Sequence, residues 1–227
     1  MAEMAKGTGD FGPIYMGIDL GTYRASITAS NGLRKTILNV VGWPKDDVSR
    51  KVFGREVVFG YEALRHRLAL NIVRPFEKGV IKYSDGSSLA NPEHISKHRE
   101  AAKELVRYIV SLAAPEKGRP VYGVIGAPAQ ASVINKQALV EAASETLESV
   151  IVVSEPFSVA YGLDMLEDAL IIDIGAGTVD LCRMHGALPE ENDQITLTTA
   201  GDYVDELLLK LVKENHPEVQ LTINMAR

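Results

Sequence analysis

Two stretches of this chain, about 150 residues apart, are built on the same pattern. "YMGIDLGTYRASI" begins at Tyr15 and "LIIDIGAGTVDLC" begins at Leu170. Each has an apolar run, an aspartate, a glycine in a small turn and a second apolar run. Short apolar runs joined by glycine-rich turns are typical of β-hairpins. Two copies of one hairpin predict two similar domains, each of which presents its turn to a shared cleft.

The rest of the chain alternates between strand and helix patterns. Apolar residues at helical spacing, with Pro92 near the start, predict a helix over 93–113. Further helices are expected over 132–149, from Glu155 and Pro156 onward, and over 202–215. Strands are expected at 14–20, 25–30, 34–41, 121–128, 150–154, 169–173, 178–182 and near 195–201. We also expect a strand pair within 51–60 and a surface loop over 74–88.

Composition argues against several classes of protein. The net charge is −6 and the pI is near 5.4, whereas nucleic-acid binders need basic faces. The single cysteine, Cys182, leaves no disulfide framework and favours a reducing compartment. Residues 1–13 lack the apolar core of a signal peptide, and no run is apolar enough to span a membrane. We therefore expect a soluble, cytoplasmic protein without direct membrane insertion.

The turn of each hairpin is rich in small residues. These are Gly21 and Thr22 in the first turn, and Gly175, Ala176, Gly177 and Thr178 in the second. Successive backbone N–H groups in such turns can form a nest that binds phosphate without net positive charge. Two nests that face each other would hold a polyphosphate from both sides.

Carboxylates stand where the strands end. Asp19 and Asp173 would repel phosphate directly, but they can hold hydrated Mg²⁺, which prefers waters, one or two carboxylates and substrate oxygens. Asp180 can serve the same purpose or orient a water. Glu155 follows a buried strand and precedes Pro156, so it can accept a proton from an attacking water. The same position also suits a residue that only caps the helix.

Each feature has a simpler interpretation. A single Asp-x-Gly-Thr is often an ordinary turn, and Glu155 alone can be a helix-end acid. "DIGAGTVD" is more specific, and the three features together favour the functional interpretation. Cys182 lies on an apolar strand, which predicts a buried and inert thiol. The histidines lack ligand spacing and are expected to be structural or on the surface: His66, His94, His98, His185 and His216.

These motifs resemble those of the actin, Hsp70 and sugar-kinase ATPase superfamily. "GIDLGT" resembles its first phosphate motif, "YGVIGAPAQASVINKQALVEAA" its first connecting strand and hinge helix, and "DIGAGTVD" its second phosphate motif. Within the superfamily the chain is most similar to bacterial actins, in particular those of magnetosome filaments. "NVVGWPKD", "VVSEPFSVAYGLD" and "AGDYVDELL" carry that similarity, which extends from about residue 14 to the end.

The resemblance implies an α/β fold of the actin-like (ribonuclease H-like) type, with two similar domains around a nucleotide cleft. It implies a flexible tail over 1–13, a domain I over 14–150 with a small inserted subdomain at about 50–90, and an incomplete domain II over 151–227. The implied activity is ATP hydrolysis coupled to filament assembly, with ATP and Mg²⁺ bound. The implied partners are further copies of the chain, a full-length paralogue or magnetosome-associated proteins.

The resemblance also implies roles for individual residues. Asp19 and Asp173 resemble the magnesium-associated acids, and Glu155 resembles the residue that positions the hydrolytic water. Glu155 and Asp173 are therefore the candidate catalytic residues. The phosphate cradle corresponds to Gly21, Thr22, Tyr23 and the turn 175–178. Tyr23 and Arg24 are bulky for the first turn, and we expect Arg24 to lie on the solvent face of the next strand rather than at a phosphate.

Chains of this superfamily continue with the rest of domain II, an adenosine-contacting loop and a second connecting helix. We therefore expect either a fragment of a longer protein or a naturally shortened relative. The pattern of the last helix predicts burial of Val204, Leu207, Leu208 and Leu211. In an incomplete domain, Leu207, Leu208 and Leu211 would instead form an uncovered apolar face.

Two alternatives to a filament-forming ATPase remain open. One is a metabolic kinase of the same superfamily, for which the segment 83–93 offers Asp85 and Glu93 but no convincing base motif. The other is a truncated, non-catalytic paralogue that binds full-length filaments and modulates them.

Overall fold

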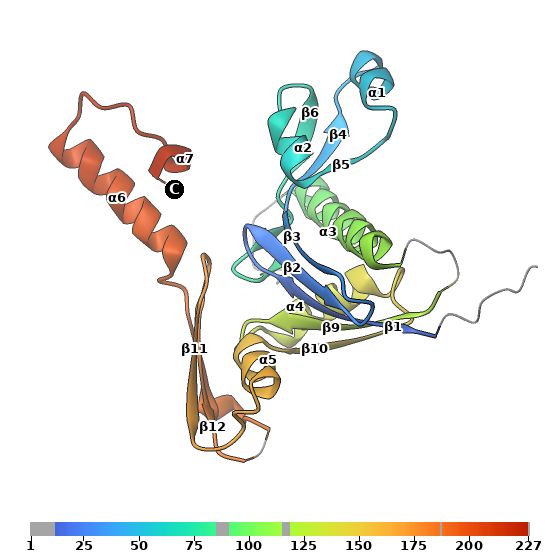
Figure 1. Ribbon diagram of the computed structural model, residues 1–227. Coiled ribbons are helices and arrows are strands. Elements are labelled where there is room, and N and C mark those ends of the chain that lie inside the picture. The colour runs from blue at the N-terminus through green and yellow to red at the C-terminus, as the bar shows by residue number, and fades with distance from the viewer. Residues whose placement is uncertain (1–11, 85–90, 115–118, 187, 227) are drawn as a thin grey trace, which may run out of the picture.

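The computed structural model describes residues 12–84, 91–114, 119–186 and 188–226. Most of the tail expected over 1–13 and the candidate Asp85 lie outside the described residues. The largest unit is a five-stranded sheet in the order β10-β9-β1-β2-β3 (Figure 1). Its strands are β1 (Ile14–Leu20), β2 (Arg24–Ala29), β3 (Arg34–Leu38), β9 (Val121–Ala127) and β10 (Ser149–Ser154). The strands β1, β9 and β10 are parallel, so their carboxyl ends lie at one edge of the sheet.

One face of this sheet is buried under two helices. Along β1, buried and exposed residues alternate, as expected for a strand with one covered face. The helices α3 (Pro92–Ala113) and α4 (Val133–Ala143) contribute to the same core cluster as β1 and β9. Asn91 caps α3 by accepting a hydrogen bond from Glu93 N–H (3.0 Å). The opposite face of the sheet is open, and Tyr15 and Ile151 are exposed on it.

A small antiparallel sheet, β5-β4-β6, extends from this unit. It is formed by β4 (Val41–Pro44), β5 (Val58–Phe59) and β6 (Leu70–Val73), with the helix α2 (Gly60–Arg65) beside it. The strand pair expected within 51–60 is wrong in part, because the helix α1 (Asp47–Phe53) occupies residues 51–53. Asp46 caps this helix by accepting from Ser49 N–H (2.7 Å), and Gly54, at φ 63°, ends it.

A short hairpin occupies the first part of the surface loop expected over 74–88, of which 85–88 lie outside the described residues. It consists of β7 (Phe76–Glu77) and β8 (Val80–Ile81). Lys78 and Gly79 join the strands with φ values of 52° and 69°, as in a two-residue type I′ turn. Phe76 and Ile81 are buried in the main core, so the hairpin is an integral part of the fold.

The second sheet, β11-β12-β13, is smaller and entirely antiparallel. It follows α5 (Glu155–Gly162) and comprises β11 (Ala169–Ile174), β12 (Val179–Met184) and β13 (Gln194–Leu197), with a 3₁₀ turn at Glu191–Asp193. Among the described residues, its buried core cluster consists of Ala160 on α5 and of Ile171, Cys182 and Met184.

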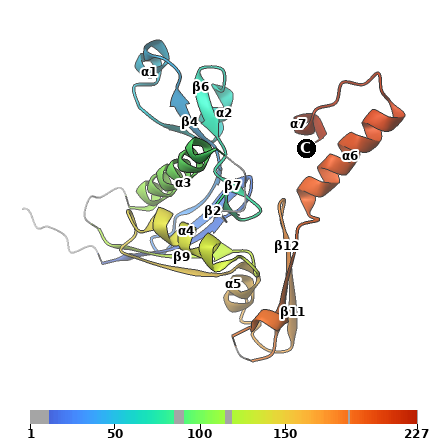
Figure 2. The ribbon, with the colours of Figure 1, turned by 180° about the vertical axis from the view of Figure 1, so that it is seen from behind.

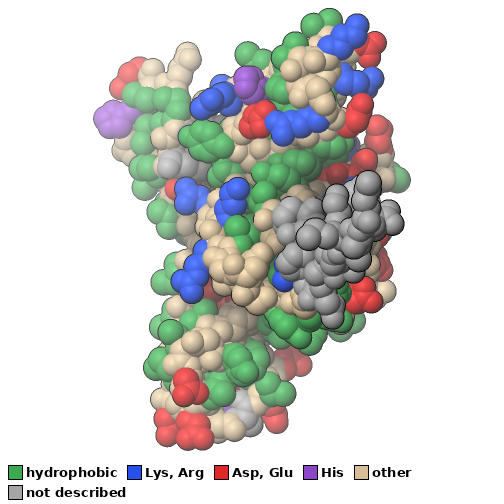
Figure 3. Space-filling view, turned by 45° about the vertical axis from the view of Figure 1, so that its right-hand side comes forward, with side chains coloured by type: hydrophobic (Ala, Val, Ile, Leu, Met, Phe, Trp, Pro, Cys, Tyr) green, Lys and Arg blue, Asp and Glu red, His purple; other side chains and the backbone are tan. Residues whose placement is uncertain are grey.

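The helix α6 (Gly201–Asn215) stands apart from both sheets (Figures 1 and 2). A short helix, α7 (Ile223–Ala226), follows it. No residue of α6 is buried, so the expected burial of Val204, Leu207, Leu208 and Leu211 is wrong. The uncovered apolar face expected for an incomplete domain is confirmed. Figure 3 shows hydrophobic side chains at the surface over this part of the molecule.

The end of one expected helix falls at another position in the structure. The helix expected over 132–149 ends at Ala143, because the chain then turns to join the sheet, where Glu148 N–H donates to Val121 O (2.9 Å). The division into domains at 150/151 stays a prediction, and the five-stranded sheet itself continues through β10 to Ser154. Among the described residues, no helix is long and apolar enough to cross a membrane.

Candidate functional site

Two of the predicted acids lie at the edge where the parallel strands end. In the sheet register, Asp19 on β1 is opposite Gly126 on β9, and Gly126 is opposite Val153 on β10. Glu155, two residues beyond Val153, is the first residue of α5. A Cβ at position 126 would lie 3.1 Å from Glu155 Cγ. The absence of a side chain at Gly126 therefore lets Glu155 pack across β9 toward Asp19.

The third acid, Asp173, comes from the second sheet. It lies near the end of β11, and together with Asp19 and Glu155 it lines a cavity of about 300 Å³. The rest of the lining comes from β1, β2, β9 and α5. Three acids that are far apart in the sequence thus meet in one cavity.

Burial raises the pKa of each of these acids. For Glu155 the pKa is raised to about 8, with further repulsion from Asp19, Asp180 and Asp173. The pKa of Asp19 is raised by burial and by Asp173, although a hydrogen bond from Gly21 N–H opposes this. The pKa of Asp173 is raised by burial and by Asp180. Clustered shifts of this kind are typical of functional sites.

This set of oxygen donors suits a hydrated divalent cation. None of the described residues that line the cavity is basic, so a bound cation would relieve the repulsion among the carboxylates. The described part of the chain contains no group of three acidic, histidine or cysteine side chains placed to hold a metal directly. Mg²⁺ usually keeps several waters and binds through one or two carboxylates and substrate oxygens. Magnesium bound through water by Asp19 and Asp173 is compatible with both observations.

The turn between β11 and β12 is fixed by the start of α6. Gly201 N–H donates to Gly175 O (3.2 Å), and Asp202 N–H donates to Ala176 O (2.7 Å). The N–H groups of Ala176 and Gly177 have no acceptor among the described residues. The turn is thus held by its carbonyl groups, which leaves two amides for an anionic ligand.

The two turns meet directly. A Cβ at position 177 would overlap Thr22 Oγ1 and would lie 2.7 Å from Lys78 Cα, so only glycine fits there. Lys78 N–H donates to Thr22 Oγ1 (3.0 Å), which leaves the hydroxyl proton of Thr22 for another acceptor. Gly175 N–H closes the second turn on Thr178 O (2.9 Å). The two turns that the sequence predicts to bind phosphate are therefore in direct contact.

A comparison with protein families follows the same part of the chain. The family model described as "MreB/Mbl protein" matches residues 14–226. The chain belongs to the MreB/Mbl family.

This MreB/Mbl protein has curated relatives of greater length. It is 41% identical over 213 residues to "Actin-like protein MamK" of Paramagnetospirillum magneticum. This match covers 94% of this chain and 58% of the relative. It is 40% identical over 225 residues to the MamK protein of Magnetospirillum gryphiswaldense, and this match covers 99% of this chain and 60% of the relative. The chain thus spans about 60% of the length of these relatives.

Solved structures show the same similarity in space. A MamK double helical filament matches with a TM-score of 0.84 and 40% identity, over 95% of this chain and 63% of that one. A non-polymerising MamK mutant bound to AMPPNP matches with a TM-score of 0.70 at 40% identity, over the same shares. MreB5 of Spiroplasma citri bound to ADP matches with a TM-score of 0.70 over 94% of this chain and 60% of that one. At 20% identity it supports the fold alone. The actin-like fold predicted from the sequence is confirmed.

In this MreB/Mbl protein the Asp180 side chain does not line the cavity and is hydrogen-bonded within the protein. Its side chain is 1% exposed and accepts hydrogen bonds from Ala129 N–H (2.8 Å) and the Thr196 hydroxyl (2.5 Å). Next to it, Gln130 N–H donates to Thr196 Oγ1 (2.9 Å), and Thr196 N–H donates to Gln130 Oε1 (3.1 Å). Asp180 therefore joins the segment after β9 to the second sheet, and it acts on the site only through its charge.

Sequence reasoning missed one component of the site, the tip of the β7–β8 hairpin. Lys78 contacts both phosphate turns through its backbone, and a Cβ at Gly79 would lie 2.5 Å from Pro128 Cγ and 3.5 Å from Glu155 Oε1. The available signal was the Lys-Gly pair between two short apolar segments, which favours a two-residue hairpin turn. Arg24, in contrast, lies on an exposed position of β2, as expected.

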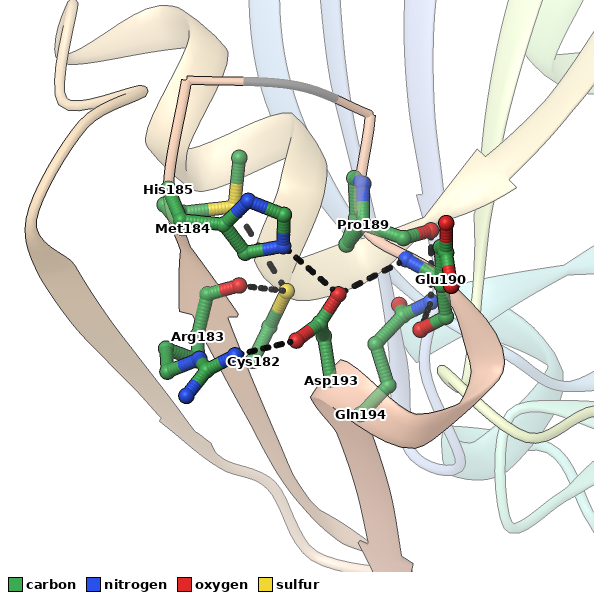
Figure 4. Close-up of polar contacts among 8 residues, drawn as sticks. All are labelled: Cys182, Arg183, Met184, His185, Pro189, Glu190, Asp193 and Gln194. Atoms are coloured by element: carbon green, nitrogen blue, oxygen red, sulfur yellow. Dashed lines mark hydrogen bonds and ion pairs between the residues drawn. The ribbon is translucent and has the colours of Figure 1, made fainter.

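Cys182 on β12 and His185, which directly follows that strand, belong to a separate set of polar contacts (Figure 4). Asp193 accepts from Arg183 Nη2 (3.1 Å) and pairs with His185 Nε2 (2.8 Å), which raises the pKa of His185. Cys182 is buried, as expected, with its Sγ 3.5 Å from Met184 Sδ. Burial raises the pKa of the thiol, which disfavours the reactive thiolate.

Proposed function

We propose that this chain is the nucleotide-binding part of an actin-like ATPase whose subunits assemble into filaments. ATP would bind between a domain at 14–150 and a partial second domain at 151–227. Its phosphates would lie at the turns 21–23 and 175–178. One observation carries the proposal: two turns from separate sheets meet beside a cavity lined by Asp19, Glu155 and Asp173. The relationship to MamK, a mutant of which is bound to AMPPNP, supports a nucleotide as the ligand.

The three acids would have separate roles in hydrolysis. Asp19 and Asp173 would hold Mg²⁺ through water, which neutralises the transferring phosphoryl group when bound. Glu155 would orient the attacking water and accept its proton. In the structure, burial and neighbouring acids favour the protonated form of Glu155. A positive charge in the cavity would lower its pKa and restore the carboxylate that the reaction needs.

We further propose that the filaments are cytoplasmic and organise magnetosomes together with magnetosome-associated proteins. The 40–41% identity to two MamK proteins over nearly the whole chain supports this. A kinase function has no such support.

A second candidate function is favoured by the surface of α6. No residue of this helix is buried, and its apolar face has no cover among the described residues. A chain with such a face would associate with a longer relative more readily than it would remain alone. We therefore keep modulation of full-length filaments as an alternative to independent assembly.

Nucleotide binding provides the first test. Binding of a fluorescent ATP analogue to residues 1–227 should be weak and should strengthen with Mg²⁺. Asp173→Ala should remove the magnesium-dependent part. Asp47→Ala, which changes an exposed acid on α1, should leave binding unchanged. Binding that is indifferent to both Mg²⁺ and Asp173 would contradict the proposed site.

Assembly provides the second test. Contacts to the phosphates alone are screened by salt and shared with water, so nucleotide affinity should be weak and we expect the chain alone to hydrolyse ATP negligibly. Because the apolar face of α6 is uncovered, we expect irregular association rather than regular filaments. Pelleting and negative-stain microscopy with and without Mg-ATP check this, and ordered ATP-dependent filaments would contradict it. A changed yield of pelleted MamK filaments on addition of the chain would support the modulator.

A further inference from the structure

One hydrogen bond between side chains links the first turn to the helix that fixes the second. The Tyr23 hydroxyl donates to Asp202 Oδ1 at 3.0 Å, across 179 positions of sequence. Tyr23 directly follows Gly21 and Thr22 in the first turn. Asp202 is the second residue of α6, and its own N–H holds the second turn at Ala176 O. The bond therefore ties the two turns to each other.

Both partners of this bond are held by their own side of the molecule. The backbone of Tyr23 accepts from Asn39 N–H (2.8 Å), and the Arg74 guanidinium lies 5.8 Å from the centre of its ring. Asp202 is held through the backbone of the second turn. Because α6 buries no residue, its position relative to the large sheet depends strongly on polar contacts of this kind.

We propose that Tyr23 and Asp202 form a latch that closes the phosphate end of the nucleotide site and slows nucleotide release. This inference rests on the proposed function. Phosphates held between two turns can leave only when the turns separate, and separation breaks the Tyr23–Asp202 bond. The side chain of Tyr23 is thus a positioning group that acts through Asp202, and the phosphate contact that the sequence motif implies is left to the backbone of the turn. A large side chain is needed at position 23 for this bond, because a small one could not reach α6.

The charges around Asp202 make the donated hydrogen bond more important. Burial and the neighbouring acids Asp205, Glu206 and Glu77 raise the pKa of Asp202, and Lys82 opposes them. A hydrogen bond from a hydroxyl stabilises an ionised carboxylate more than it stabilises a neutral one. Loss of the tyrosine hydroxyl would therefore weaken the closed arrangement even though only one atom is removed.

The test is the release rate of a ribose-labelled fluorescent ATP analogue from residues 1–227 with Mg²⁺, measured by stopped flow. Tyr23→Phe should speed release roughly tenfold, the scale of one hydrogen bond to a charged group. In an Asp202→Ala background the same change should alter release by less than about twofold, because the partner is already gone. Tyr61→Phe, at a tyrosine that is 71% exposed, is the matched control and should release at the wild-type rate. Unchanged release in Tyr23→Phe, or independent effects of the two substitutions, would overturn the latch.

A second measurement needs no nucleotide. Hydrogen–deuterium exchange of the nucleotide-free chain should be faster in Tyr23→Phe at residues 175–178 and 201–206, and unchanged in Tyr61→Phe. If the wild-type chain binds no ATP analogue, the proposed function fails for this chain. Hydrogen–deuterium exchange would still test whether the Tyr23–Asp202 bond links the two turns. Faster exchange in Tyr23→Phe would then support the link between the turns, and unchanged exchange would overturn it.

Discussion

The two hairpins that share a sequence pattern differ in what supports them. The β1–β2 hairpin lies within five strands and under α3 and α4, and the inward side chains of β1 are fully buried. The β11–β12 hairpin lies in a three-stranded sheet, where Ile171, Cys182 and Met184 are its buried apolar residues. The local pattern therefore determines the turn, whereas the packing around it determines how firmly that turn is held.

This difference divides the candidate site into a rigid half and a compliant half. Asp19 and Glu155 stand on the edge of the large sheet, while Asp173 and the second turn depend on a small core and on α6. Regions with few buried apolar contacts open locally at lower free energy than the core does. A cleft with one fixed and one mobile wall can admit and release a ligand without unfolding the larger domain.

The largest expected effect contrasts two leucines on helices from the two halves. Leu139 on α4 is 1% exposed and Leu208 on α6 is 45% exposed. Leu139→Ala should lower the free energy of unfolding by about 3 kcal/mol or more, because it leaves a cavity in the main core. Leu208→Ala should change it by less than about 0.5 kcal/mol. Urea denaturation measures both values, and equal losses would show that α6 packs against the protein in solution.

The next effect concerns catalysis. In an active full-length protein that carries these residues, Glu155→Ala should slow ATP hydrolysis by roughly 10²-fold or more, while assembly persists. Glu148→Ala, at an exposed residue just before the opposite end of β10, is the control and should keep the wild-type rate. Unchanged turnover in Glu155→Ala would reduce Glu155 to a residue that caps α5.

A smaller effect should appear in the pH dependence of stability. Because the folded protein raises the pKa of Glu155 from 4.5 to about 8, it binds this proton more tightly than the unfolded chain does. The stabilisation is complete below pH 4.5 and is lost as the pH rises to about 8. Water entering the open cavity should limit the loss to roughly 2 kcal/mol in the absence of metal and nucleotide. Glu155→Gln should flatten the profile in this pH range, and an unchanged slope would show that Glu155 is ionised in the folded protein.

The smallest expected effect tests the contact between the turns. Gly177→Ala would press a methyl group against Thr22 and Lys78 and should weaken nucleotide binding about tenfold, the effect of roughly 1.4 kcal/mol of misplacement. Gly162→Ala, where nothing lies within 4 Å of the added methyl group, should bind like the wild type. Equal affinities in the two variants would mean that the turns lie farther apart in solution.

Much of the fold follows from sequence patterns that act over short distances. The repeated hairpin and the helical face of 93–113 each predict an element that the structure contains. The meeting of Asp19 and Glu155 depends on the parallel pairing of β1, β9 and β10, which brings their carboxyl ends to one edge and which the sequence patterns do not predict. The helix α1 was misread because Val52 and Phe53 favour strands. The stronger signals are Asp46, which caps the start of α1, and Gly54, which ends it.

The contacts between the two halves could not be predicted from the sequence. The strands β7 and β8 have two residues each, too few to show alternation, so nothing in the sequence places Lys78 beside Thr22. The Tyr23–Asp202 bond depends on how α6 emerges from the second turn, which only the folded chain defines. Local sequence patterns predict each of the two turns, but the position of one turn relative to the other depends on the tertiary structure.

The burial of Cys182 has a practical consequence for spectroscopy. It is the only cysteine of the chain, and its side chain is 0% exposed. A thiol-reactive dye should therefore ignore the native protein and label only cysteines introduced at exposed sites. Leu68 beside the small sheet and Val204 on α6 are suitable positions, because both side chains are exposed. A donor and an acceptor fluorophore at these positions would report the distance between the two halves of the molecule in real time, without prior removal of a natural thiol.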